Sequence, residues 1–167
     1  MKVFGFPNPV NEKAARTVAG VVLVTSILLL ALSATVSHAW LWGTAVLAYG
    51  FVARVLTGPT LSPLGSFAMK VAAPRLGEPR FVAGPPKRFA QAVGAAFTVA
   101  GVVVLALGHP LPAQVLLGCL VMASGLESIF AICLGCTVFA GLMRIGLVPQ
   151  EVCEACNDIS LRAGAAG

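Results

Sequence analysis

Hydrophobic positions gather into long runs along the chain, and polar positions gather between them. An α-helix rises about 1.5 Å per residue, so a run near 20 residues covers the roughly 30 Å hydrocarbon core of a bilayer. A helix also satisfies its own backbone hydrogen bonds in lipid. The pattern predicts an all-α integral membrane protein, a four-helix bundle forming one domain over residues 1–167, with spans at residues 18–35, 40–55, 89–107 and 113–132.

Composition supports a lipid solvent. Hydrophobic residues make up 58% of the chain and charged residues only 10%. These proportions leave too few polar side chains to cover a water-soluble globule of this length. The composition therefore excludes an ordinary soluble domain.

The placement of the 11 Lys and Arg residues predicts the orientation in the membrane. None lies in the short connections at residues 36–39 and 108–112. The positive-inside rule then places the termini and the middle loop in the cytoplasm, with the protein multi-pass in the plasma (inner) membrane. This topology explains the net charge of +5 without a nucleic-acid partner, and the basic loop favours the anionic headgroups of the lipid bilayer.

The middle loop contains an amphipathic pattern followed by prolines. Apolar residues recur at helical spacing from Leu61 to Ala72, which predicts an interfacial helix lying on the membrane surface. The stretch at residues 74–87 holds four prolines, which favour an extended course over the cytoplasmic face.

Two charged residues are predicted at similar membrane depth. Glu127 lies inside the fourth span, where an unpaired charge costs about 2.5 to 3.5 kcal/mol on insertion scales. Arg54 lies equally far along the second span, so we predict an Arg54–Glu127 ion pair, with Arg16 as the alternative partner. The pair either fixes the register of the bundle or takes part in proton or thiol chemistry.

Two CxxC pairs form the most informative pattern in the chain. Cys133–Cys136 and Cys153–Cys156 are separated by 16 residues in the region 133–167. The first pair is predicted at the cytoplasmic boundary of the fourth helix. A short cytoplasmic helix from Gln150 onward would turn the second pair back toward it. In an unbroken fourth helix, Glu127 and Cys136 would lie on opposite faces.

The spacing of the cysteines leaves three interpretations open. Cys133, Cys136, Cys153 and Cys156 have the number and spacing of a tetrahedral zinc site. Alternatively, Cys133 and Cys136 are catalytic thiols that form a disulfide or carry sulfur. In the third interpretation the thiols only pack the end of the bundle.

Several motifs resemble those of one known family. They are Phe4-Gly5-Phe6, Pro9-Val10-Asn11-Glu12, Gly58-Pro59, the stretch Gly84-Pro85-Pro86-Lys87-Arg88-Phe89-Ala90-Gln91, and Cys133-Leu134-Gly135-Cys136. These residues resemble the bacterial membrane proteins catalogued as domain of unknown function 4395. The resemblance covers nearly the whole chain. It implies the membrane fold and a thioredoxin-like or sulfurtransferase partner.

Two hypotheses of different classes follow. In the leading hypothesis, a membrane bundle presents its cytoplasmic CxxC motifs to a soluble partner for thiol-redox or sulfur-transfer work. In the alternative, zinc bound by the cysteines stabilises a membrane scaffold or interaction protein without catalysis. The two hypotheses differ in metal content and in thiol reactivity.

Overall fold

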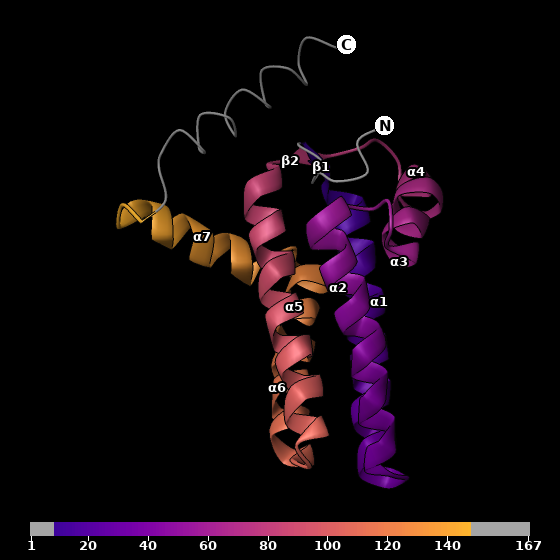
Figure 1. The fold of residues 1–167 in the computed structure, drawn as a ribbon. Coiled ribbons are helices and arrows are strands. Elements are labelled where there is room, and N and C mark those ends of the chain that lie inside the picture. Colours follow the sequence, from indigo (N-terminus) through magenta and orange to yellow (C-terminus); the bar gives the residue numbers. More distant parts are fainter. Residues whose placement is uncertain (1–8, 148–167) are drawn as a thin grey trace.

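The computed structural model describes residues 9–147, in which four long helices form an antiparallel bundle (Figure 1). They are α1 (Glu12–Thr35), α2 (Thr44–Thr57) preceded by the 3-10 helix η1 (His38–Gly43), α5 (Gly84–Ala106) and α6 (Pro110–Phe130). Counting η1 together with α2, all four are long and apolar enough to cross a membrane. The predicted all-α membrane fold is confirmed at this level.

The bundle is apolar both inside and outside. α1 packs on α6, α2 on α5, and α5 on α6. Val22, Leu41, Phe51 and Leu117 are buried in the core, whereas Val46 is 73% exposed on the outside. Many other large apolar side chains are exposed as well, and a surface of this kind is favourable in lipid and costly in water. The stem of the bundle therefore has the surface of a membrane-embedded protein.

α5 begins earlier than the predicted span at residues 89–107. Pro85 and Pro86 lie in its first turn, where a missing backbone N–H loses no helical hydrogen bond, so the helix starts at Gly84. This start places Lys87 on the helix instead of in the loop. Lys87 is buried, on the face of α5 that continues to Thr98.

The predicted helix in the middle loop is present. It consists of α3 (Pro63–Phe67), the π-helical segment η2 (Ala68–Ala72) and α4 (Ala73–Arg75), with Ser62 capping its start. All three segments pack against α1. The predicted extended course at residues 74–87 is right only for its middle part. Helix continues through Arg75, and α5 has already begun at Gly84.

A two-stranded pairing that the sequence analysis did not predict joins the start of α1 to the loop. β1 (Val10–Asn11) and β2 (Phe81–Val82) are antiparallel. Beside them, the Arg80 guanidinium and the Glu12 carboxylate form a salt bridge, with 3.0 Å between Nε and Oε2. The loop is therefore fixed to the end of the bundle at both α1 and α5.

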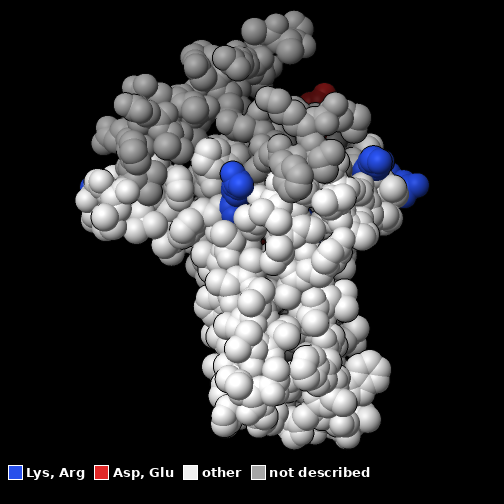
Figure 2. Space-filling model, viewed as in Figure 1, with Lys and Arg blue, Asp and Glu red and all other residues white. Residues whose placement is uncertain are grey.

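Charged side chains gather at that same end. Figure 2 shows Lys and Arg at the broad end of the molecule and an uncharged stem below it. The broad end also contains α3, α4, the β1–β2 pair and α7 (Leu134–Arg144), which leaves the bundle at an angle (Figure 1). The four spans thus have one charged end and one uncharged end.

Candidate thiol site at the end of α6

The cysteine pair lies at a break between two helices. α6 ends at Phe130, and Ala131 adopts the left-handed conformation with φ of 59°. The N–H of Ile132 then donates to the carbonyl of Leu126 at 3.1 Å, which closes the helix end. Cys133 is the N-cap residue of α7 and Cys136 lies in its first turn. The expected continuous helix is therefore wrong, because the chain turns at Ala131.

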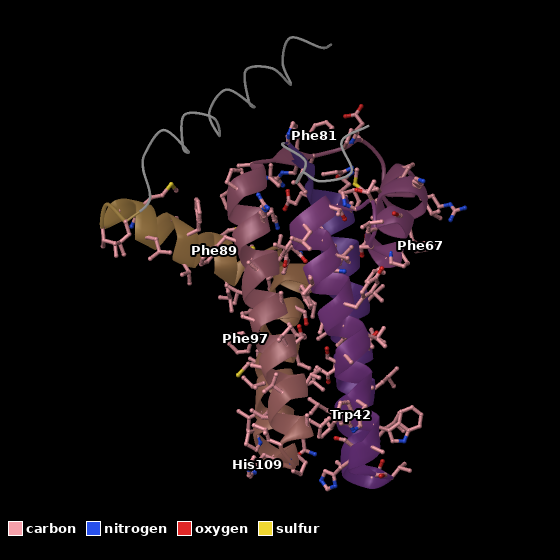
Figure 3. All side chains as sticks on the ribbon, in the orientation of Figure 1. Trp42, Phe67, Phe81, Phe89, Phe97 and His109 are labelled. Atoms are coloured by element: carbon pink, nitrogen blue, oxygen red, sulfur yellow. The ribbon has the colours of Figure 1, made fainter. Side chains whose placement is uncertain are left out.

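Close packing of α7 on α5 positions the pair. A Cβ atom placed on Gly135 would lie 2.5 Å from both Cα and Cβ of Ala90, so only glycine permits this approach. The rings of Phe89 and Phe139 pack on each other with centroids 5.6 Å apart. Figure 3 shows Phe89 where α7 meets α5. The cysteines consequently lie against the first turns of α5.

The two thiols differ in their tendency to ionise. A hydrogen bond with the Cys136 side chain lowers the pKa of Cys133 from its ordinary 9.0 to about 7, and the Lys87 charge acts in the same direction. The same hydrogen bond, with burial, raises the pKa of Cys136. A position at a helix N-terminus also favours a thiolate. Cys133 is therefore the thiol that ionises first, although Cys136 is the more exposed.

A buried ion pair lies next to the thiols. The ammonium Nζ of Lys87 is 2.6 Å from Oε1 of Glu127, and the two side chains are only 9% and 15% exposed. Because α5 starts at Gly84, Lys87 reaches Glu127 from one of the helices packed on α6. The predicted partnership of Glu127 with Arg54 is therefore corrected: Lys87 is the direct partner.

Arg54 and Arg16 have other partners. Arg54 is buried, and its guanidinium donates to Oε1 of Gln91 at 2.8 Å and to Oγ of Ser62 at 3.3 Å. Arg16 donates to the carbonyl of Ser128 at 3.0 Å, near the C-terminal end of α6, where a positive charge is favourable. Both arginines fix helix ends near the site without pairing directly with Glu127.

A cavity of about 340 Å³ opens beside Cys133 and is lined by residues of α1, α2, α5, α6 and α7. Cys133 and Glu127 both line it, together with the aromatic rings of Phe51, Phe89 and Phe97. The expectation that Glu127 and Cys136 lie on opposite faces assumed an unbroken helix, and α6 ends before both cysteines. The break at Ala131 turns the chain so that Cys133 shares a cavity with the acid.

Comparison with protein families matches residues 10–144 to the domain of unknown function DUF4395. The chain belongs to this family. The matched region of the chain includes the four spans and both Cys133 and Cys136. It ends before Cys153 and Cys156. Comparison with curated proteins and with solved structures finds no match.

The structure of this chain does not test the zinc hypothesis, which stays a prediction. Cys153, Cys156 and the short helix predicted from Gln150 lie outside the described residues 9–147. Within those residues, no group of three or more His, Cys, Asp or Glu side chains could hold a metal ion. The fifth cysteine, Cys119, belongs to neither CxxC pair; it is exposed on the bundle surface and also lines the cavity.

The rate of Cys133 alkylation should depend on pH with a midpoint near 7, because the thiolate is the reactive form and its pKa is lowered to about 7. Cys136→Ala removes the hydrogen bond and should move the midpoint to higher pH. Cys136→Ser retains a hydroxyl donor and should move it less. Iodoacetamide labelling resolved by peptide mass measures each midpoint. An unchanged midpoint in Cys136→Ala would contradict the assigned cause.

Proposed function

We propose that the protein is a membrane thiol-redox protein whose Cys133–Cys136 pair cycles between dithiol and disulfide with a soluble thioredoxin-like partner. One observation carries this proposal: the pair starts a helix, with Cys133 at its N-cap and Cys136 in its first turn. Two thiols one turn apart can close a disulfide without moving other elements. The interaction between their side chains supports that proximity.

The unequal exposure of the two sulfurs suggests how a partner would react. In the oxidised pair, the thiolate of a soluble dithiol would attack the more exposed sulfur, that of Cys136. A mixed disulfide forms between the partner and Cys136, and the Cys133 sulfur leaves as a thiolate. A thiol with a lowered pKa is the better leaving group. The second thiol of the partner then releases Cys136, so two electrons and two protons pass to the membrane protein.

In the proposed function, the end of the bundle that holds the cysteine pair faces the cytoplasm. The basic residues gather at the broad end of the molecule (Figure 2), and the cysteine pair lies at that end, at the start of α7 (Figure 1). The positive-inside rule favours the cytoplasm for such an end, which gives cytoplasmic termini in an inner membrane. The helical loop from Pro63 to Arg75 would then lie on the inner leaflet.

A trapping experiment tests the exchange. In a background with Cys153 and Cys156 replaced by serine, Cys133→Ser should accumulate a mixed disulfide through Cys136, because the resolving thiol is gone. The probe is a thioredoxin variant that keeps only its attacking cysteine, in a mildly oxidising thiol buffer. Non-reducing electrophoresis measures the adduct. Cys136→Ser should give much less adduct, because Cys133 is buried.

Cys119→Ser is the matched control, because this cysteine belongs to neither CxxC pair. It should leave the yield of adduct in the Cys133→Ser protein unchanged. An adduct that depends on Cys119, or no adduct with either single variant of the pair, would refute the proposed exchange.

A further inference from the structure

The cavity beside Cys133 is elongated along the bundle. On α5 its lining runs from Phe89 to Phe97, and on α6 from Glu127 to Cys119, which are eight residues each or about 12 Å of helix. Figure 3 labels Phe89 near α7 and Phe97 further along the stem. A cavity of about 150 Å³ accommodates benzene, so 340 Å³ holds a substituted ring and the first part of its tail.

The cavity opens to the outside of the bundle between apolar side chains. Val93, Leu134 and Val138 line it and are 37%, 43% and 54% exposed. All three are apolar, and Val93 lies inside a membrane-length helix. A ligand that enters past these side chains must be soluble in lipid.

The polar groups of the lining gather at the end near α7. Cys133, Glu127 and Gln91 lie there. Further along α6 the Ser124 hydroxyl donates to the Leu120 carbonyl of its own helix, and the far end is formed by Phe97 and Cys119. Oε1 of Gln91 accepts a hydrogen bond from Arg54, and its amide nitrogen makes none within residues 9–147. An amide donor at the polar end suits a carbonyl oxygen of the ligand. An apolar cavity with a thiol and a carbonyl-binding donor at one end therefore suits a lipid-soluble carbonyl compound that accepts electrons.

We propose that this cavity binds the ring of a membrane quinone, which oxidises the Cys133–Cys136 dithiol. The proposal rests on the thiol-redox function and identifies its electron acceptor. Two S–H bonds are lost and one S–S bond forms between Cys133 and Cys136. The two electrons and two protons pass to the quinone, whose two C=O groups become the C–OH groups of the hydroquinone. Reduction by the soluble dithiol then restores the thiols.

The test uses the full chain in lipid nanodiscs, reduced and mixed with a decyl-substituted benzoquinone. We expect one hydroquinone per Cys133–Cys136 disulfide, measured by ultraviolet absorbance and by peptide mass. Ala123 lines the cavity, and Ala123→Phe should slow the reaction on the order of a hundredfold, because a displaced reactant loses its alignment. Ala96 is exposed on α5 outside the lining, so Ala96→Phe is the matched control and should leave the rate unchanged.

A second measurement uses the unsubstituted protein, so it does not depend on whether a variant folds. An azido-substituted benzoquinone should photolabel peptides of α6 and α7 that line the cavity, and decyl-benzoquinone should compete with the label. Oxidation of the pair by a soluble disulfide but not by the quinone would overturn this inference and leave the thiol-redox function standing. A pair that no oxidant converts to a disulfide would overturn both. Equal quinone rates in Ala123→Phe and Ala96→Phe, or a phospholipid that the quinone cannot displace, would also overturn the quinone site.

Discussion

Lys87→Met is expected to lower the free energy of unfolding by about 3 to 5 kcal/mol, the usual cost of leaving a buried charge without its partner. Lys87 is 7% exposed, and its Nζ lies 2.6 Å from the Glu127 carboxylate. Removing the ammonium leaves Glu127 in an apolar bundle with no direct counter-ion, although Arg54 is near enough to interact electrostatically. Unfolding in mixed micelles, titrated with sodium dodecyl sulfate and followed by circular dichroism, measures the loss.

Two further variants separate the ion pair from general effects of charge. Arg88 is the neighbouring basic residue, but it is exposed, and within residues 9–147 its side chain donates only to the Val55 carbonyl. Arg88→Met should therefore cost about 1 kcal/mol or less. The double variant Lys87→Met with Glu127→Leu removes both charges and should recover most of the stability. If Lys87→Met were as stable as the native protein, the pair would not stabilise the bundle.

Gly135→Ala is expected to displace the start of α7 and to abolish trapping of the partner thiol. The added Cβ would lie 2.5 Å from the Ala90 Cα and 3.2 Å from its backbone nitrogen, and backbone atoms cannot rotate away as a side chain can. The Phe89–Phe139 packing and the position of Cys133 against α5 depend on the same approach. The yield of mixed disulfide with the thioredoxin probe, relative to the Cys133→Ser background, measures the effect.

Gly141 supplies the matched control within the same helix. A Cβ on Gly141 meets nothing within 4 Å, and alanine stabilises a helix interior relative to glycine by roughly 0.5 to 1 kcal/mol. Gly141→Ala should thus keep the full trapping yield with equal or higher stability. Equal yields for Gly135→Ala and Gly141→Ala would show that close packing of α7 does not position the thiols.

The spans were predictable because each depends on a local property, a run of apolar residues long enough for a bilayer. The exact ends of the helices were less predictable. The prolines at residues 85 and 86 predict an extended loop when they are considered alone, although proline in a first turn is compatible with the start of a helix. An extended loop would include Lys87 among its exposed cations. The spacing of Lys87 from Gln91, Gly94 and Thr98 follows one helix face and was the signal that could have found it.

The break at Ala131 had no comparable signal. A left-handed C-terminal residue is usually glycine, and alanine gives no such indication in a sequence. The run of apolar residues from Ala113 continues through Ile132, so hydropathy favours an unbroken helix. Tertiary packing of α7 on α5 determines the turn. The relation of Glu127 to Cys133 depends on that turn, so helical spacing along the sequence does not predict it.

The redox state of Cys133 and Cys136 can be measured directly on the full chain in lipid nanodiscs, equilibrated in a series of dithiol–disulfide buffers. Peptide mass spectrometry quantifies the disulfide, and elemental analysis of the same sample gives its zinc content. We expect reversible, two-electron conversion of this pair, with Cys119 remaining a free thiol and without stoichiometric zinc. One zinc ion retained per chain, with Cys133 and Cys136 unreactive in every buffer, would contradict the thiol-redox function.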